Sequence, residues 1–143
     1  MHYTAIVTKE GKQTLAEFPG CPGCQTFADS GEEIGERASE ALLGWLEAHL
    51  VSGQAPPEPK TVRPKGRARA LQVPVPAKLA VKLALRWARK RAGLTQAELA
   101  RRAGLSQPAV ARLEDPDHNP TLDLLERVAK ALGTRLEVGL RAA

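Results

Sequence analysis

Aromatic side chains, cysteines and long apolar runs are all scarce in this 143-residue chain. Phe, Trp and Tyr make up 3% of it, so any core must be built largely from Leu, Val and Ala. No segment approaches the roughly 20 apolar residues that span a bilayer, and no basic-then-apolar secretion signal opens the chain. We therefore expect a cytoplasmic protein with no membrane contact, in which the two cysteines stay reduced.

Lysine and arginine are rare in the first part of the chain and abundant in the rest. Residues 1–59 carry 3 Lys and Arg against 9 Asp and Glu, whereas residues 60–143 carry 18 against 7. The two parts therefore have net charges of −6 and +11. An asymmetry of this size predicts two separate roles, with the basic part binding a polyanion.

The acidic part predicts a small sheet covered by one helix. Ser30 and Glu33 fit a capping box at the start of that helix, which we expect to run to Leu50. β-Branched and aromatic runs between turn residues indicate strands at His2–Thr8, Gln13–Phe18, Cys24–Ala28 and Arg67–Val75. The apolar face of the helix is expected at Ile34, Ala38, Ala41, Leu42, Trp45, Leu46 and Leu50. This βββαβ unit would leave one sheet face open, and a partner usually covers such a face.

A proline-rich segment, residues 52–66, has no apolar period and indicates a loop or linker. The pattern after it is helical, so we expect an α+β chain with one domain at residues 1–75 and an all-α domain at residues 76–143. The helices are predicted at Ala77–Ala92, Gln96–Ala103, Gln107–Glu114 and Leu122–Leu132.

The tail Thr134–Leu140 alternates polar and apolar residues, which indicates a short terminal strand. A lone strand at the end of a helical domain has no pairing partner there. We therefore expect it to pair with the same strand of a second copy, in a homodimer or a homotetramer.

Residues 95–114 carry the pattern of two helices joined by a tight turn. Ala100 is small enough for the helices to touch, and Gly104 falls where the backbone needs a positive φ. Thr95 and Ser106 stand at the two N-cap positions, where a side-chain oxygen accepts an orphan backbone N–H. The apolar contacts between the helices are predicted from Leu99, Leu105, Val110 and Leu113. This combination indicates a helix-turn-helix rather than an ordinary helical hairpin.

The second helix of such a pair enters the major groove of DNA with its N-terminal residues near base edges. Gln107 can pair with adenine, Arg112 can bond guanine in a bidentate manner, and Ala109 can touch a thymine methyl. Pro108 falls in the first helical turn, where its missing N–H costs little. The exposed positions are predicted to be Ser106, Gln107, Pro108, Ala109, Ala111 and Arg112.

Residues 80–133 resemble the lambda-repressor-like helix-turn-helix family. The matching residues are Arg89, Gly93, Leu94, Thr95, Gln96, Glu98, Leu99, Ala100, Gly104, Leu105, Ser106, Val110, Leu113, Glu114, Asn119, Pro120 and Thr121. The resemblance implies that Gln96 and the Asn119 region hold the DNA backbone, and the helix start at Thr95 suits a phosphate. It also implies a structural salt bridge between Arg89 and Glu114; the alternative is two independent surface charges.

The acidic part is similar to the HicB antitoxin family. The similarity lies in the first strand, the Pro22-Gly23-Cys24 turn, the acidic helix start and the amphipathic helix to Leu50. The junction Val75–Ala80 also resembles HicB proteins with a helix-turn-helix tail. The family implies a truncated RNase H-like domain that binds a small HicA-type toxin ribonuclease, and a second domain that represses the operon at its operator DNA. Cys21 is a departure from the family pattern.

Cys21 and Cys24 form a CxxC motif with three possible meanings. Half of a zinc site would need more ligands, and the candidates His2, His49 and His118 are scattered. A redox pair usually lies at a helix start, whereas this motif lies between predicted strands. We favour two incidental thiols and expect no metal and no cofactor.

An RNase H-type hydrolase needs several carboxylates converging on metal ions. The predicted strands offer only Glu17, and Asp29 lies near a helix start. We therefore expect no enzyme. The acidic residues of the helix are either a solvated face or an attraction for a basic toxin.

The sequence predicts an antitoxin that neutralises an endoribonuclease and represses its own operon. The alternative is a stand-alone transcriptional regulator whose N-terminal domain senses a small ligand; a thiol enzyme using the CxxC motif is a third hypothesis.

Overall fold

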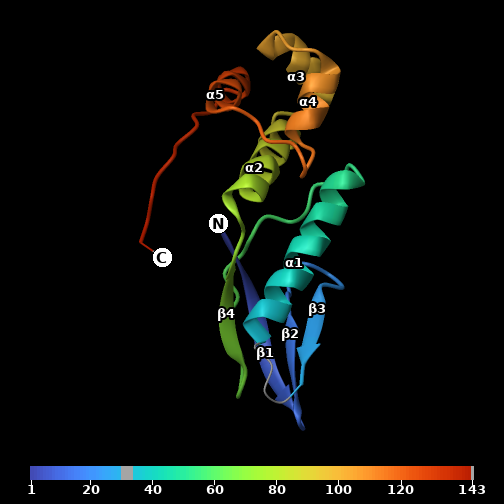
Figure 1. The fold of residues 1–143 in the computed structure, drawn as a ribbon, viewed down its shortest axis with the longest axis vertical. Helices are drawn as coiled ribbons and strands as arrows, with labels where there is room; N and C mark the ends of the chain where they lie inside the picture. Colours follow the sequence, from blue (N-terminus) through green and yellow to red (C-terminus); the bar gives the residue numbers. More distant parts are fainter. Residues whose placement is uncertain (30–33, 143) are drawn as a thin grey trace. The chain divides into compact units, whose positions relative to one another are not determined.

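A computed structural model describes residues 1–29 and 34–142 (Figure 1). The chain divides into two compact units, Met1–Ala80 and Val81–Ala143, and the division falls inside helix α2 (Ala77–Arg91). The predicted capping box of Ser30 and Glu33 lies outside the described residues. None of the described helices is both long enough and apolar enough to cross a membrane.

The first unit contains a four-stranded antiparallel sheet with strand order β3-β2-β1-β4 (Figure 1). Its strands are β1 (His2–Glu10), β2 (Gln13–Glu17), β3 (Gln25–Ala28) and β4 (Arg69–Pro74). All four predicted strands are therefore confirmed, with ends that differ by one or two residues. The predicted likeness to RNase H stays a prediction.

Helix α1 (Ile34–Val51) covers one face of this sheet (Figure 1). Every fourth residue of α1 is buried, in the order Ile34, Ala38, Leu42, Leu46 and Leu50. On the sheet face beneath α1, the buried residues include Tyr3, Ala5, Val7 and Ala16. The predicted βββαβ order and the apolar spacing of the helix are confirmed, because residues four apart lie on one helical face.

The proline-rich segment forms no helix or strand between Val51 and Arg69, as its composition predicts. Its path is fixed at Pro57, whose carbonyl oxygen accepts a hydrogen bond of 2.7 Å from the Tyr3 hydroxyl. The segment therefore returns the chain from the end of α1 to β4 within the first unit.

The second unit holds the remaining helices around one apolar core. After α2 come α3 (Gln96–Ala103), α4 (Gln107–Leu113) and α5 (Leu122–Ala131), so all four predicted helices are confirmed. The core is built from Leu85, Leu99, Ala100, Ala103, Val110, Leu113, Leu125 and Val128. Three of these come from α3 and two from α4, so the core fixes the angle between the two helices.

The tail after α5 is irregular in the single chain. Residues 134–142 form no strand, and the strand predicted at Thr134–Leu140 is one that pairs with a second copy. A strand exists only through hydrogen bonds to a neighbour, and a single chain offers the tail none. Leu136 packs against the core of the second unit, while Val138 and Leu140 are exposed.

Candidate nucleic-acid interface

Helices α3 and α4 each begin at a side-chain cap. The Thr95 hydroxyl accepts a hydrogen bond of 3.1 Å from the backbone N–H of Glu98, and the Glu98 carboxylate completes a capping box. These hydrogen bonds lower the pKa of Glu98. The Ser106 hydroxyl accepts a hydrogen bond of 3.2 Å from the N–H of Ala109. Both predicted N-caps are confirmed: Thr95 begins α3, and Ser106 begins α4 directly after the turn.

The turn between the two helices depends on Gly104 and on Arg127 from α5. Gly104 has a φ of 65°, in the left-handed region, as predicted. The Arg127 guanidinium donates hydrogen bonds to the carbonyl oxygens of Ala103 (2.7 Å) and Gly104 (3.1 Å). The positive φ is what favours glycine at position 104, and a Cβ there would lie 2.8 Å from the Arg127 Nη2, so that guanidinium would have to shift. No pattern in the sequence distinguishes Arg127 from other exposed arginines.

Helix α4 has an apolar inner side and a polar outer side. Val110 and Leu113 are buried in the core, as predicted. Of the predicted DNA-contacting residues, Ser106, Gln107, Pro108 and Arg112 are exposed, and Ala109 and Ala111 are half-buried. Pro108 lies in the first turn of α4. The structure therefore brings these six residues onto one short surface.

Two glutamines connect the starts of α3 and α4. The Gln107 amide donates a hydrogen bond of 3.0 Å to the Gln96 side-chain oxygen, and the Gln96 amide donates one of 3.2 Å to Glu114. Gln96 therefore links Gln107, on the outer side of α4, to the buried Glu114 carboxylate at the end of α4. Sequence reasoning assigned Gln96 to the DNA backbone and missed both of these contacts.

Glu114 follows α4 and is almost completely buried among cations. The Arg89 guanidinium donates to both Glu114 carboxylate oxygens, with a distance of 2.9 Å from Nη2, and also donates to the Leu94 carbonyl oxygen. The Nε of Arg86 lies 2.7 Å from the same carboxylate. Burial raises the pKa of Glu114, but the hydrogen bonds from Arg89 and the charges of Arg86 and Arg89 outweigh it and lower the pKa. This cluster ties α2 to the end of α4.

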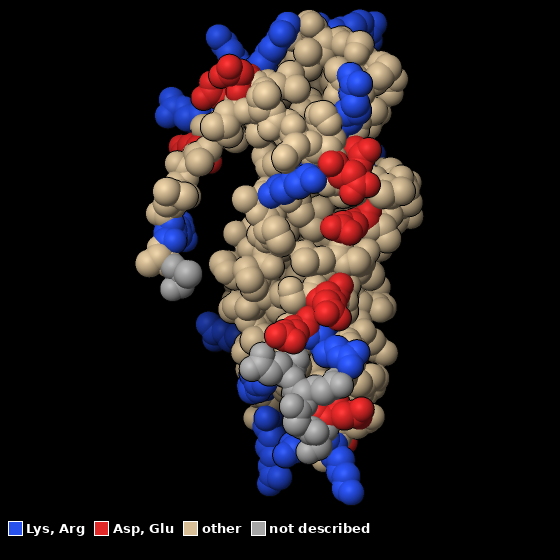
Figure 2. Space-filling view, viewed as in Figure 1, with Lys and Arg blue, Asp and Glu red and all other residues tan. Residues whose placement is uncertain are grey.

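The remaining residues predicted to contact DNA, Thr95 and Asn119, are exposed on other elements than α4. Thr95 is exposed at the start of α3, and Asn119 is exposed in the loop between α4 and α5. Arg101 and Arg102 are exposed on α3, and Figure 2 shows Lys and Arg side chains around the α3–α5 end of the second unit. The surface of α3 and α4 thus combines hydrogen-bonding side chains with positive charge, which suits a phosphate-rich duplex.

The CxxC motif forms a tight turn in the first unit. The N–H of Cys24 donates to the Cys21 carbonyl oxygen at 2.9 Å, and both side chains are buried as free thiols. Burial raises the pKa of Cys21 to about 12 and that of Cys24 to about 11, which keeps both thiols protonated and unreactive at neutral pH. Across residues 1–29 and 34–142, no three or more His, Cys, Asp and Glu side chains are grouped to hold a metal ion.

The capped helix pair, its glycine turn and the amphipathic α4 define a helix-turn-helix DNA-binding protein with a separate α+β unit. In agreement, residues 85–138 match the helix-turn-helix family.

Relatives extend this similarity over most of the chain. Antitoxin HicB 1 of Photorhabdus laumondii subsp. laumondii is 32% identical over 126 residues, which cover 88% of this chain and 77% of the relative. Antitoxin HicB of Escherichia coli strain K12 is 28% identical over 124 residues, with 87% of each chain covered. The chain belongs to the HicB antitoxin family. A chain of the solved HicA3 and HicB3 toxin-antitoxin complex is 21% identical and covers 53% of this chain and 99% of its own, with a TM-score of 0.43, too low to define a common fold.

Proposed function

We propose that this antitoxin blocks a HicA-type mRNA endoribonuclease through residues 1–75 and represses its own operon through residues 76–143. The proposal rests on one observation: the same chain is similar to HicB antitoxins and also carries a helix-turn-helix. Similarity to HicB antitoxins spans both units, and the second unit presents a helix-turn-helix with a polar outer surface. Both targets, mRNA and operator DNA, are cytoplasmic, so the protein acts there.

On the DNA side, α4 lies in the major groove. Gln107 pairs with an adenine edge, Arg112 bonds guanine, and Ala109 contacts a thymine methyl, with Ser106, Pro108 and Ala111 lining the same surface. The start of α3 at Thr95 and Gln96 and the loop at Asn119 hold phosphates on either side. The hydrogen bond that the Gln107 amide donates to the Gln96 side-chain oxygen supports this assignment, because it places a residue assigned to a base edge next to one assigned to a phosphate.

The toxin side is tested with the product of the gene next to this one. We expect that product to be toxic when expressed alone, to cleave RNA in vitro, and to lose both activities when the full-length antitoxin is added in equimolar amount. A harmless neighbour that forms no complex with the antitoxin would contradict the proposal. A small molecule that changes operator binding in the absence of a toxin would instead favour the stand-alone regulator.

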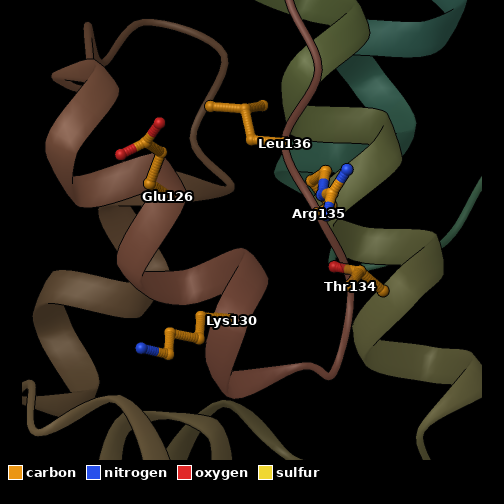
Figure 3. A pocket seen from close by; sticks show the side chains of 5 residues that line it. All are labelled: Glu126, Lys130, Thr134, Arg135 and Leu136. Atoms are coloured by element: carbon orange, nitrogen blue, oxygen red, sulfur yellow. The ribbon is translucent and has the colours of Figure 1, made fainter.

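The tail after α5 supports a dimer. Its residues Thr134, Arg135 and Leu136 form one wall of a groove of about 410 Å³, and Glu126 and Lys130 of α5 line it as well (Figure 3). Beyond this groove the apolar side chains of Val138 and Leu140 are exposed. Pairing the tails of two copies as antiparallel strands would satisfy the tail backbone and cover these side chains.

Deleting residues 134–143 should therefore convert the protein to monomers or weaken its dimers. The reason is that the deletion removes both the backbone groups and the apolar side chains that a second tail would cover. Light scattering of the purified protein measures the mass, and a deletion of residues 141–143 alone serves as the control. A mass unaffected by the longer deletion would eliminate pairing through the tail.

A further inference from the structure

The register of the sheet separates its side chains into two faces. Residues directly paired across antiparallel strands lie on the same face, and successive residues along a strand alternate. Tyr3, Ala5, Val7 and Ala16 lie under α1, so the residues between them lie on the opposite face. That second face, here called the open face, carries Thr4, Ile6, Thr8, Glu10, Gln13, Leu15, Glu17, Gln25, Phe27, Ala70 and Gln72.

One row of the open face is apolar, with an exposed aromatic ring on the edge strand β3 beside the buried Leu15 of β2. Phe27 pairs with Leu15, which in turn pairs with Thr8, and Ile6 lies in the neighbouring row beside Ala70. The Phe27 side chain is 43% exposed, although the chain has only two phenylalanines. An exposed aromatic side chain within an apolar row is typical of an anchor in a protein interface.

The margin of the open face is acidic. Glu10 and Glu17 belong to this face by register, and Asp29 joins it through a hydrogen bond of 2.9 Å from the Gln13 amide. All three carboxylates are exposed. The cations of the described strands, Lys9 and Arg69, lie on the α1 side, because Lys9 pairs with Thr14 and Arg69 with Val7. An exposed apolar anchor with acidic side chains near it complements a partner that has an apolar patch beside basic side chains.

We infer that the open face, with Phe27 on the edge strand β3 as its exposed apolar anchor, is the surface that binds the toxin. This inference rests on the proposed function. A ribonuclease must present a cationic surface to hold RNA phosphates. An acidic sheet face docked there would neutralise that surface and exclude RNA at the same time.

The outer side of α1 is the competing surface, since it carries Glu36, Glu40 and Glu47. It also carries Arg37, and from Glu36 to Glu47 it exposes no large apolar side chain. Charge without an apolar anchor raises the rate of encounter more than it holds a complex together. The structure therefore favours the open face over the outer side of α1.

The experiment compares variants of the full-length chain in binding to the purified toxin. Phe27→Ser should weaken toxin binding about 30-fold or more, as the loss of an interface anchor does. The double variant Glu10→Lys and Glu17→Lys should slow association with the toxin, and most strongly at low salt. The matched control is Glu36→Lys with Glu40→Lys on α1, which should leave toxin affinity unchanged. Operator binding and the urea midpoint report that each variant is folded.

Three results separate the possibilities. If the wild-type chain binds no toxin, the proposed function fails. If the wild-type chain and both open-face variants bind the toxin equally while the α1 variant does not, the docking surface is wrong and the function stands. If Phe27→Ser changes only the mass of the free protein, the open face joins two copies of this chain, and the inference is overturned.

Discussion

Replacing Glu114 with alanine should lower the free energy of unfolding of the second unit by about 3–5 kcal/mol. The change leaves the guanidinium groups of Arg86 and Arg89 buried without the carboxylate that both contact. It also removes the link between α2 and the end of α4. Urea unfolding followed by circular dichroism measures the loss. The control is Glu126→Ala on α5, an exposed carboxylate whose removal should change stability by no more than about 0.5 kcal/mol.

The same cluster predicts an acid-sensitive fold. Because the folded state lowers the pKa of Glu114, the carboxylate stabilises the protein above the usual pKa of a glutamate, and this stabilisation disappears as the pH falls through the lowered value. Urea midpoints should therefore drop below about pH 4 in the wild-type chain. Glu114→Gln should be less stable at neutral pH and should show a shallower decline in acid. Parallel pH profiles of the two proteins would contradict this role for Glu114.

Arg112→Ala should cost about 1–3 kcal/mol of discrimination at one guanine position of the operator and leave non-specific DNA binding nearly unchanged. Arg112 is exposed on the outer side of α4, where a guanidinium can reach a base edge. Gln96→Ala should instead weaken binding to all sequences about equally, since Gln96 lies at the start of α3, where phosphates bind. Titration of operator, single-base variants and unrelated DNA at one salt concentration distinguishes the two effects.

Arg102→Ala is the matched control for Arg112→Ala. It removes the same charge from an exposed position on α3. We expect it to reduce the salt dependence of binding without changing sequence preference. If Arg112→Ala and Arg102→Ala have the same effect on every DNA, then α4 does not read the groove.

Short-range signals predicted the helix-turn-helix well. The caps at Thr95 and Ser106 and the left-handed turn at Gly104 each involve backbone groups within four residues, so the local sequence is enough to specify them. The inward positions of Val110 and Leu113 follow from helical periodicity in the same way. The tail forms no strand in the single chain, because alternation indicates a capacity to pair but supplies no partner; its pairing with a second copy stays a prediction.

The contacts that hold the candidate site together were largely missed. Arg86 joins Arg89 at Glu114, and Arg127 reaches the turn from a helix more than twenty residues further along the chain. Nothing local distinguishes these arginines from exposed ones. Their roles depend on which helix faces meet, and this is decided by the shape of the assembled core.

The sequence by itself determined the order of the strands and helices, the helix-turn-helix and the separation of acidic from basic charge, because composition, periodicity and capping act over short distances. Only the tertiary structure decided that Arg86 and Gln96 join the predicted pair of Arg89 and Glu114, that Arg127 holds the turn, and that Phe27 is exposed on an acidic sheet face. These features require residues distant in the chain to meet in one register and one packing arrangement, which local preferences do not encode.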